Sequence, residues 1–516
     1  MKQCPQCNRV ETDDALVFCR ADGTRLVTCA QDSESSATLS LPSLPTSAEL
    51  PTSQLDGKTS IAVLPFANMS ADPDNEYFCD GLAEELLNAL AKIDDLKVAA
   101  RTSSFAFKGQ NISVEKLGQE LHVNTILEGS VRRAGNRLRI TVQLINASDG
   151  YHIWSERYDR ELQDIFEVQD EITLAVVKAL KLRLLGDEKD AVLKRYTNNA
   201  EAYQLYLRGR FFFFKRTAEG FRKAIECFEQ AIKIDSEYAL ALSGLADCYT
   251  FLGFYEIIAP AEAREKVKAA ALRALELDDS LAETHTSFAF YLTTYEWDFL
   301  ESEKHFKQAI GLNPRYALAH HLHAANLIFR GMVAEGIAAV TYAIELEPFT
   351  VIFNAALAWW YYLAQRNQEA IAQSLKTIDI APNHFFAYWT LGLAYAQEKR
   401  YEDAIASLQK AASLIDFNQH ILGDLGRVYA LNGQPEKAAA LIAELTSSAR
   451  EGHVFGANIA KIYVGLGDKD KIFEWLDQAF TERSVRMPWF IVDPAVHSIS
   501  DDPRFQDLQR RIGLCR

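Results

Sequence analysis

Hydrophobic and polar residues follow different periods in successive parts of this chain. Residues 30–57 are rich in Ser, Thr and Pro and show neither a helical nor a strand period, so we predict a disordered linker there. Residues 60–66 form a short apolar run, and residues 80–93 place leucine and isoleucine side chains on one helical face. A strand followed by a helix is therefore expected at the start of the next domain.

Three further strands are expected in the same domain, at residues 125–133, 137–146 and 151–158. The segments between them contain Gly135 and Gly150, as tight hairpin turns require. In the second of these strands apolar residues alternate with Arg, Thr and Gln, so one face should be buried and the other solvated. The other predicted elements are a strand at 96–101 and helices at 114–121 and 165–185. Together they predict a compact α/β domain over residues 58–190.

Carboxylates gather between the first strand of this domain and its first helix. They are Asp72, Asp74, Glu76, Asp80, Glu84 and Glu85. A catalytic site would need a convergent His, Lys or second acid, or the spacing of metal ligands, and the sequence offers none of these. Acids at the start of a helix accept hydrogen bonds from free N–H groups and match the positive end of the helix dipole. Asp74, Glu76 and Asp80 lie where the following helix begins, so we interpret them as helix-capping.

A spacing of 34 residues recurs in the second half of the chain, between Pro314, Pro348 and Pro382. This is the period of the tetratricopeptide (TPR) repeat, a pair of helices with small residues at fixed places. The segment YWTLGLAYAQEKRYEDAIASLQKAASL fits the TPR consensus well. We predict an α-helical TPR solenoid of about eight helical pairs over residues 198–484, closed by a C-terminal cap over residues 485–516.

TPR solenoids bind extended peptides in a concave groove lined by the first helix of each pair. By consensus counting, the groove residues here are Trp359, Tyr362, Phe386, Trp389, Arg427 and Lys461. Aromatic rings with nearby cations would suit an apolar peptide with an acidic end. The alternative, that these rings only pack between repeats, stays open. His321 and Ala325 stand where some TPR proteins carry a clamp for a terminal carboxylate, which disfavours the binding of chaperone tails.

Four cysteines lie within the first 29 residues, a density that points to a metal and a reducing compartment. Cys4 and Cys7 are two residues apart, and Cys19 with Asp22 would complete a tetrahedral zinc site, with Cys29 as the competing fourth ligand. Residues 1–29 are thus predicted to be a small zinc ribbon, folded around structural zinc. The alternative is a disordered tail with free thiols. The segment carries four basic and four acidic side chains, which gives it no basic surface for nucleic acid.

Composition and charge bear on which partners and which cellular location the protein can have. The net charge of −16 repels polyanions, so no nucleic-acid partner is expected. No run of apolar residues approaches the length of a membrane span, and the first residues lack the apolar core of a signal peptide. These features predict a cytoplasmic protein without a membrane span. They leave its oligomeric state open.

Several motifs of the α/β domain resemble a known family. They include SIAVLPFANMSADPDNEYFCDGLAEELLNAL, ILEGSVRRAGNRLRITVQLI and DGYHIWSERYDREL. With the repeats behind it, residues 58–190 are similar to the TolB amino-terminal-like domain of bacterial TPR proteins. Relatives attach this pair to winged-helix DNA-binding domains, nucleotide cyclases or protein kinases. The resemblance implies a sensory or interaction module.

The expected protein is therefore an α+β multi-domain chain with a zinc ribbon, an α/β domain and a TPR solenoid. Neither a Walker A loop nor a nucleophile elbow, kinase or cyclase motif is found. We predict a non-enzymatic protein–protein interaction scaffold in bacterial signalling or regulation, which binds a partner peptide in the TPR groove. The alternatives are a DNA-associated transcriptional regulator that uses the ribbon and an enzyme with its site in residues 58–190.

Overall fold

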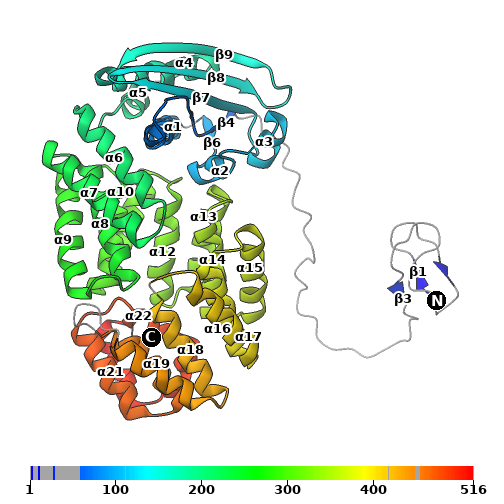
Figure 1. Cartoon of the computed structure of the whole chain (residues 1–516), viewed down its shortest axis with the longest axis vertical. Helices are drawn as coiled ribbons and strands as arrows, with labels where there is room; N and C mark the ends of the chain where they lie inside the picture. Colours follow the sequence, from blue (N-terminus) through cyan, green and yellow to red (C-terminus); the bar gives the residue numbers. More distant parts are fainter. Residues whose placement is uncertain are drawn as a thin grey trace. The chain divides into compact units, whose positions relative to one another are not determined.

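The computed structural model describes residues 59–514 except 94, 111, 185, 417 and 448–453, together with three short strands nearer the N-terminus. The chain divides into two units, Met1–Gly57 and Lys58–Arg516. In the first unit the strands pair antiparallel in the order β2-β1-β3, and Figure 1 labels β1 and β3. Their bounds are β1 Lys2–Gln3, β2 Val10–Glu11 and β3 Val27–Thr28.

A mixed sheet opens the second unit, with the strand order β6-β4-β7-β8-β9. Strand β4 runs parallel to its neighbours β6 and β7, whereas β7, β8 and β9 form an antiparallel meander, as the hairpin turns predicted. The short strand β5 also pairs with β7. The bounds are β4 Thr59–Val63, β5 Ala67–Asn68, β6 Leu96–Val98, β7 Thr125–Ala134, β8 Arg137–Asn146 and β9 His152–Glu161.

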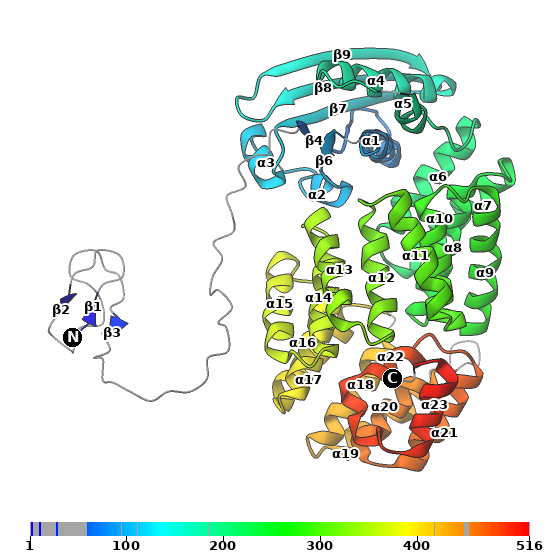
Figure 2. The same cartoon turned by 180° about the vertical axis from the view of Figure 1, so that it is seen from behind.

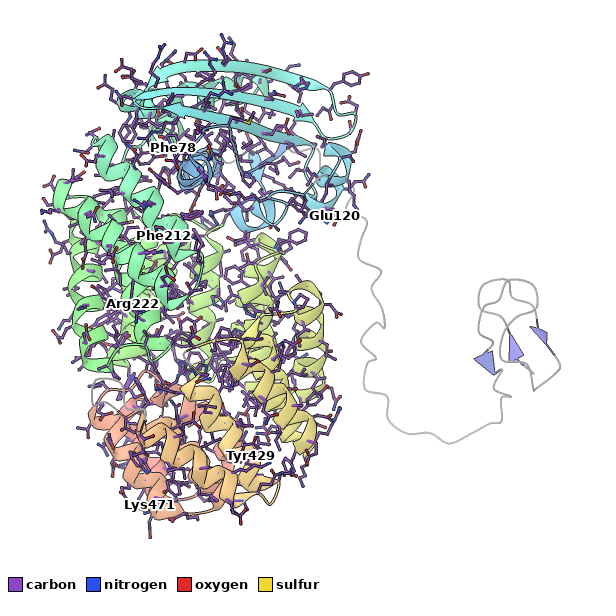
Figure 3. All side chains as sticks on the ribbon, viewed as in Figure 1. Phe78, Glu120, Phe212, Arg222, Tyr429 and Lys471 are labelled. Atoms are coloured by element: carbon purple, nitrogen blue, oxygen red, sulfur yellow. The ribbon has the colours of Figure 1, made fainter. Side chains whose placement is uncertain are left out.

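Helices cover both faces of this sheet because its central strands are apolar on both sides. On one face, α1 (Glu76–Leu90) and α4 (Ile165–Ala179) pack on the alternating apolar residues of β8. Phe78 of α1 is fully buried there, beneath the sheet (Figure 3). On the other face, α3 (Val114–Leu121) forms a smaller cluster with Ala62 and Ile126.

Helices α6 to α21 follow as eight successive pairs in the part of the chain that the structure describes (Figure 1). Small residues at the 34-residue period let paired helices approach, since a Cβ at Gly392 would lie 2.7 Å from Leu408 Cγ. The bounds are α6 Ala200–Phe213, α7 Ala218–Ile234, α8 Ala239–Phe254, α9 Pro260–Leu277, α10 Ala282–Tyr291, α11 Phe299–Leu312, α12 Ala317–Phe329, α13 Val333–Leu346, α14 Val351–Leu363, α15 Asn367–Ile380, α16 Phe385–Gln397, α17 Tyr401–Ser413, α18 Gln419–Leu431, α19 Pro435–Ser447, α20 Gly456–Leu466 and α21 Lys469–Thr481.

The C-terminal segment turns back toward the inner side of these pairs. It comprises α22 (Met487–Val492), a 3₁₀ helix at Pro494–Ile499 and α23 (Pro503–Ile512). Helix α22 contacts both α12 and α21 and lies close to the end of α12 in the rear view (Figure 2). The segment therefore reaches a middle pair of the solenoid as well as the last one.

Buried ion pairs join the α/β domain to the first helical pair. Glu84 of α1 accepts hydrogen bonds from Arg101 Nε and from Arg210 Nη2 of α6, each at 2.8 Å. Burial alone would raise the pKa of Glu84, but the charges of Arg101 and Arg210 outweigh it and hold that pKa below its usual value. This carboxylate therefore stays ionised at the domain junction.

The helix-capping interpretation of the acidic segment is corrected in part. Glu76 lies in the first turn of α1, where a carboxylate matches the helix dipole. Asp80 lies one turn further along and is buried, and Lys108 Nζ donates to both of its oxygens, at 2.8 and 2.7 Å. Asp80 and Glu84 are thus partners in ion pairs, and their cations come from distant parts of the sequence.

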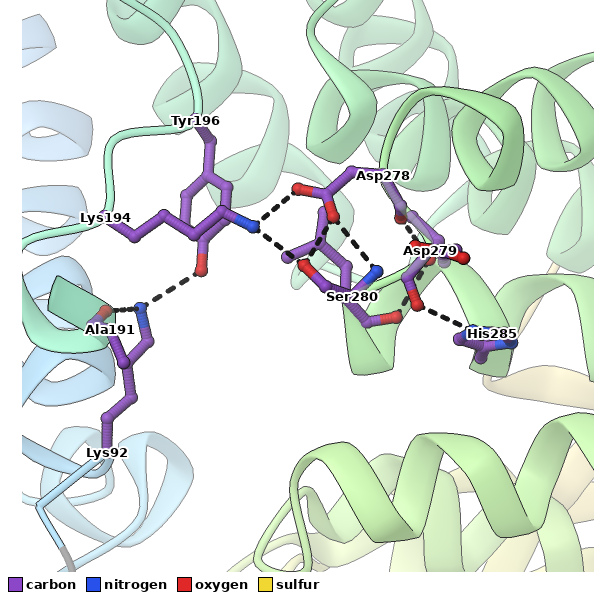
Figure 4. A network of polar contacts seen from close by, with 10 residues as sticks. Lys92, Ala191, Lys194, Tyr196, Asp278, Asp279, Ser280 and His285 are labelled. Atoms are coloured by element: carbon purple, nitrogen blue, oxygen red, sulfur yellow. Dashed lines mark hydrogen bonds and ion pairs between the residues drawn. The ribbon is translucent and has the colours of Figure 1, made fainter. Parts of the chain in front are cut away.

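Two lysines hold the segment that links the α/β domain to α6 (Figure 4). Lys92 Nζ donates to the carbonyl oxygen of Ala191 at 2.8 Å and to the Tyr196 hydroxyl at 3.1 Å. Lys194 Nζ donates to Asp278 Oδ2 and Ser280 Oγ, both at 2.8 Å. The linking segment is therefore fastened to the end of α1 and to the turn between α9 and α10.

Candidate functional site

The predicted groove residues lie on the first helices of consecutive pairs and converge on one another. Trp359 of α14 lies 5.4 Å from Phe386 and 5.2 Å from Trp389 of α16, measured between ring centroids. Arg427 of α18 and Lys461 of α20 continue the same inner surface. The four aromatic side chains and Arg427 are buried, and the Lys461 side chain retains only 14% of its exposure.

The cover over these residues is the chain's own C-terminal segment. Trp489 of α22 stacks on Trp359, with ring centroids 4.4 Å apart and ring planes 26° apart. It also stacks on Trp360 at 5.6 Å. Next to it, Asp493 accepts a hydrogen bond from the Tyr362 hydroxyl and lies 3.1 Å from Lys461 Nζ. The aromatic and the cationic parts of the predicted groove are both engaged within the molecule.

Opposite charges balance at the polar end of this contact. Asp424 accepts hydrogen bonds from Trp389 Nε1 at 2.8 Å and from Lys461 Nζ at 2.9 Å. Burial alone would lower the pKa of Lys461, but Asp424 and Asp493 outweigh it and raise that pKa. Burial alone would raise the pKa of Asp493, and Lys461 and Arg427 reverse that effect. A segment that replaces Asp493 should therefore bring its own carboxylate, because Asp424 alone would otherwise balance the buried cations Lys461 and Arg427.

A cavity of about 70 Å³ lies beside Trp489 on the same inner surface. Its walls are aromatic and aliphatic side chains of α8, α10, α12, α14, α16 and α22. The contact of Tyr255, which follows α8, with Phe385 in α16, 6.1 Å between ring centroids, closes the solenoid around it. The polar lining residues are Arg216, His321, His420 and Arg486.

The two histidines of this cavity are neutral at physiological pH. Burial, reinforced by the charge of Arg216, lowers the pKa of His321 to about 3. Burial, reinforced by Arg486 and Lys461, places the pKa of His420 well below its usual value. Neutral imidazoles can donate or accept a hydrogen bond, so the cavity is equipped to bind a ligand with a polar group.

The predicted metal ligands Cys4, Cys7, Cys19 and Asp22, and the alternative Cys29, lie outside the described residues. The residues that the structure does describe contain no group of three or more His, Cys, Asp or Glu side chains placed to hold a metal ion. Among them, no helix has the length and apolarity that crossing a membrane would require.

Consensus counting named residues that the structure brings together on one inner surface, but it missed the C-terminal segment that covers them. Trp489 and Asp493 follow the last repeat, and Tyr255 and Phe385 belong to different repeats, so their contacts depend on how the pairs curve. The apolar run MPWFIV after the last repeat was the available signal, because such a run must be buried somewhere.

Two family models match parts of this chain. The model of the HilA/YgeH-like transcriptional regulator, second domain, matches residues 57–175. The tetratricopeptide repeat model matches residues 395–469 and confirms the predicted TPR repeats in the C-terminal region. Among solved structures, the Cut9-Hcn1 hetero-tetramer of the APC/C shows a TM-score of 0.41 at 16% identity, over 68% of this chain and 63% of that chain.

Two curated relatives of this chain are named for different functions. The chain is 44% identical over 202 residues to "Putative adenylate cyclase 3" of Rhizobium meliloti (strain 1021), which covers 39% of this chain and 34% of the relative. It is 20% identical over 258 residues to the transcriptional regulator HilA of Salmonella typhimurium, which covers 50% of this chain and 46% of the relative. The chain thus spans less than half the length of both relatives.

The first of these findings corrects the prediction that the chain is not an enzyme. That prediction rested on the absence of known catalytic motifs. A relative that is 44% identical over the matched part and is named as a putative adenylate cyclase overturns it. Short motifs were an insufficient basis for exclusion, since catalytic residues brought together by a fold need not form a continuous pattern.

Proposed function

We propose that this chain is a protein–protein interaction scaffold in bacterial signalling or regulation, and that a partner segment binds the inner TPR surface where α22 lies. One observation carries the proposal: Trp489 and Asp493 of the chain itself already occupy the aromatic and cationic contacts of that surface. The tetratricopeptide match supports protein partners, and the match to the second domain of a transcriptional regulator supports a regulatory setting. The TolB-like resemblance and the DNA-associated alternative stay predictions.

The chemistry of the internal contact defines the partner. Trp489 and Asp493 lie four residues apart, so the partner segment should carry an aromatic ring and a carboxylate about one helical turn apart. The ring would stack on Trp359, and the carboxylate would replace Asp493 beside Lys461. A tethered segment competes at an effective concentration of about millimolar, so partner binding should strengthen when the internal segment is weakened.

A synthetic peptide of residues 484–499, SVRMPWFIVDPAVHSI, tests this proposal in solution. We expect weak binding to the wild-type full chain and binding tighter by about tenfold or more to the Trp489→Ala/Asp493→Ala double variant, because the internal competitor is removed. Fluorescence anisotropy of the labelled peptide measures the affinity, and a peptide with alanine at both positions is the matched control. Adding Trp359→Ala to the double variant should abolish the gain.

The proposal fails if the double variant, shown to be folded by its circular dichroism, binds the peptide no better than the wild type. It also fails if the alanine-substituted peptide binds equally well, because the contact would then lack the proposed chemistry.

A second candidate function is a nucleotide cyclase activity, favoured by the 44% identity to the relative of Rhizobium meliloti. The test is direct: the purified full chain is incubated with ATP and Mg²⁺ or Mn²⁺, and cyclic AMP is quantified by chromatography. Product that grows linearly with protein concentration would assign the activity. Product formation no faster than in a heat-denatured sample would remove this candidate for the chain alone.

A further inference from the structure

The cavity beside Trp489 is large enough for a ligand. Its volume of about 70 Å³, measured as the space open to the centre of a water-sized sphere, is several times the roughly 10–15 Å³ that one water needs. Aromatic rings dominate its wall, including Phe251, Phe290, Trp359 and Trp489. Flat ligands gain most from such walls, because aromatic rings stack or meet edge to face.

Arg216 brings a positive charge to the cavity without a matching carboxylate. Its guanidinium lies 4.4 Å from the ring centroids of Phe213 and of Phe251. In the part of the chain that the structure describes, no acidic side chain forms an ion pair with it. Asp247, whose charge acts on Arg216, instead accepts a hydrogen bond from Ser287 Oγ at 2.6 Å. The cation is thus available to an incoming anion.

Other polar groups on the cavity wall also lack partners. Among the described residues, Trp360 Nε1, Trp489 Nε1, His321 Nδ1 and His420 Nδ1 are buried without a hydrogen bond. Trp489 and His420 are 6% and 3% exposed, so their unpaired atoms do not reach bulk water. The described lining includes two arginines and no Asp or Glu. Buried donors without acceptors are unfavourable, and a bound acceptor group would relieve that cost.

We propose that this cavity binds a small aromatic carboxylate, with its ring between the aromatic walls and its carboxylate at Arg216. A guanidinium can hold a carboxylate by two parallel hydrogen bonds, and the surrounding rings exclude water that would weaken them. The proposal goes beyond the scaffold function and does not depend on it, since the ligand binds while α22 stays in place.

Benzoate is the probe, and benzyl alcohol is its neutral counterpart of similar size. Isothermal titration of the wild-type full chain should show saturable binding of one benzoate, with quenching of tryptophan fluorescence, and much weaker binding of benzyl alcohol. Arg216→Gln should weaken benzoate binding by about tenfold or more while leaving benzyl alcohol unchanged, because a hydrogen-bonded charge pair is lost. Arg222→Gln is the matched control, an exposed arginine of α7 (Figure 3) that is not among the residues lining the cavity.

A second variant keeps the proposal falsifiable if Arg216→Gln does not fold. Ala356 of α14 is 1% exposed and lines the cavity, so Ala356→Leu should fill the space and abolish benzoate binding. Absence of saturable binding to the wild type overturns the proposal. Equal affinity for benzoate and benzyl alcohol, or an unchanged affinity in Arg216→Gln, overturns the assignment of the carboxylate to Arg216. The peptide experiment above has an independent readout, so either proposal can fail alone.

Discussion

Replacing Trp489 with alanine is expected to lower the free energy of unfolding by about 3–5 kcal/mol. The side chain is 6% exposed and contacts four rings, those of Trp359, Trp360, Phe329 and Phe254. Alanine would leave a void that these rings cannot close, because they belong to different helices of the solenoid. The loss should appear as a lower midpoint of urea unfolding with intrinsic fluorescence and circular dichroism as parallel probes.

Two further variants serve as controls for the Trp489→Ala measurement. Trp489→Phe retains an aromatic ring and should recover most of the stability. Trp475→Ala removes a half-buried tryptophan of α21 and should cost less. A loss below about 1 kcal/mol in Trp489→Ala would show that α22 is not seated on the inner surface, and would also remove the basis of the proposed peptide competition.

Glu84→Gln is expected to cost a similar amount, about 3–5 kcal/mol, because it leaves the guanidiniums of Arg101 and Arg210 buried without their counter-charge. Both cations depend on this carboxylate, whose side chain is 7% exposed. The change should therefore destabilise the junction between the α/β domain and the first helical pair. Urea unfolding at neutral pH measures the effect, and limited proteolysis of the segment at 191–197 would report loosening of the junction.

The same residue predicts a dependence on pH. The pKa of Glu84 in the folded chain is held below its ordinary value of 4.5. Its contribution is therefore present above pH 4.5 and is lost as the pH falls through the folded-state pKa. Glu84→Gln should flatten this part of the stability profile. Glu219→Gln removes a fully exposed carboxylate of α7 whose pKa is also lowered by its hydrogen bond with Lys223, so it should change the stability and this profile much less, because solvent screens that pair. Parallel profiles for wild type and Glu84→Gln below pH 4.5 would contradict the assignment.

Local patterns were sufficient for most of the fold. The alternation of apolar and polar residues over 137–146 predicted β8, because alternate side chains of a strand point to opposite faces of the sheet. The turns beside Gly135 and Gly150 predicted the meander of β7, β8 and β9. The strand expected at 96–101 ends at Val98 instead, and Arg101 begins a short helix, α2 (Arg101–Phe105). The hydrophobic periodicity does not indicate that the strand ends at Val98, because the position of Arg101 depends on its ion pair with Glu84 in another helix.

Interactions between distant segments could not be predicted from local sequence patterns, and the reason is physical. Asp80 looked like a capping residue because its cation, Lys108, lies 28 residues further along the chain. The ion pair of Glu84 was hidden in the same way, because its partner Arg210 is 126 residues away. The cover over Trp359 was equally hidden, because it depends on the small rotation between successive pairs, which accumulates along the solenoid. No single residue type within a repeat determines that rotation, because it results from all the contacts between neighbouring pairs together.

The contact between Tyr255 and Phe385 bears on how this solenoid would unfold. In an open array each repeat touches only its neighbours, so stability is a sum of local terms and the ends can fray one repeat at a time. Here the second pair touches the sixth, and Arg486 Nη2 near the C-terminus donates to the Phe254 carbonyl at 2.9 Å. Because of these contacts, the second helical pair packs against later parts of the solenoid as well as against its neighbours. Removal of the last pair would therefore also expose side chains of the second pair. Unfolding should consequently be concerted, and shortening the chain from its C-terminus should disrupt the whole solenoid instead of removing one repeat.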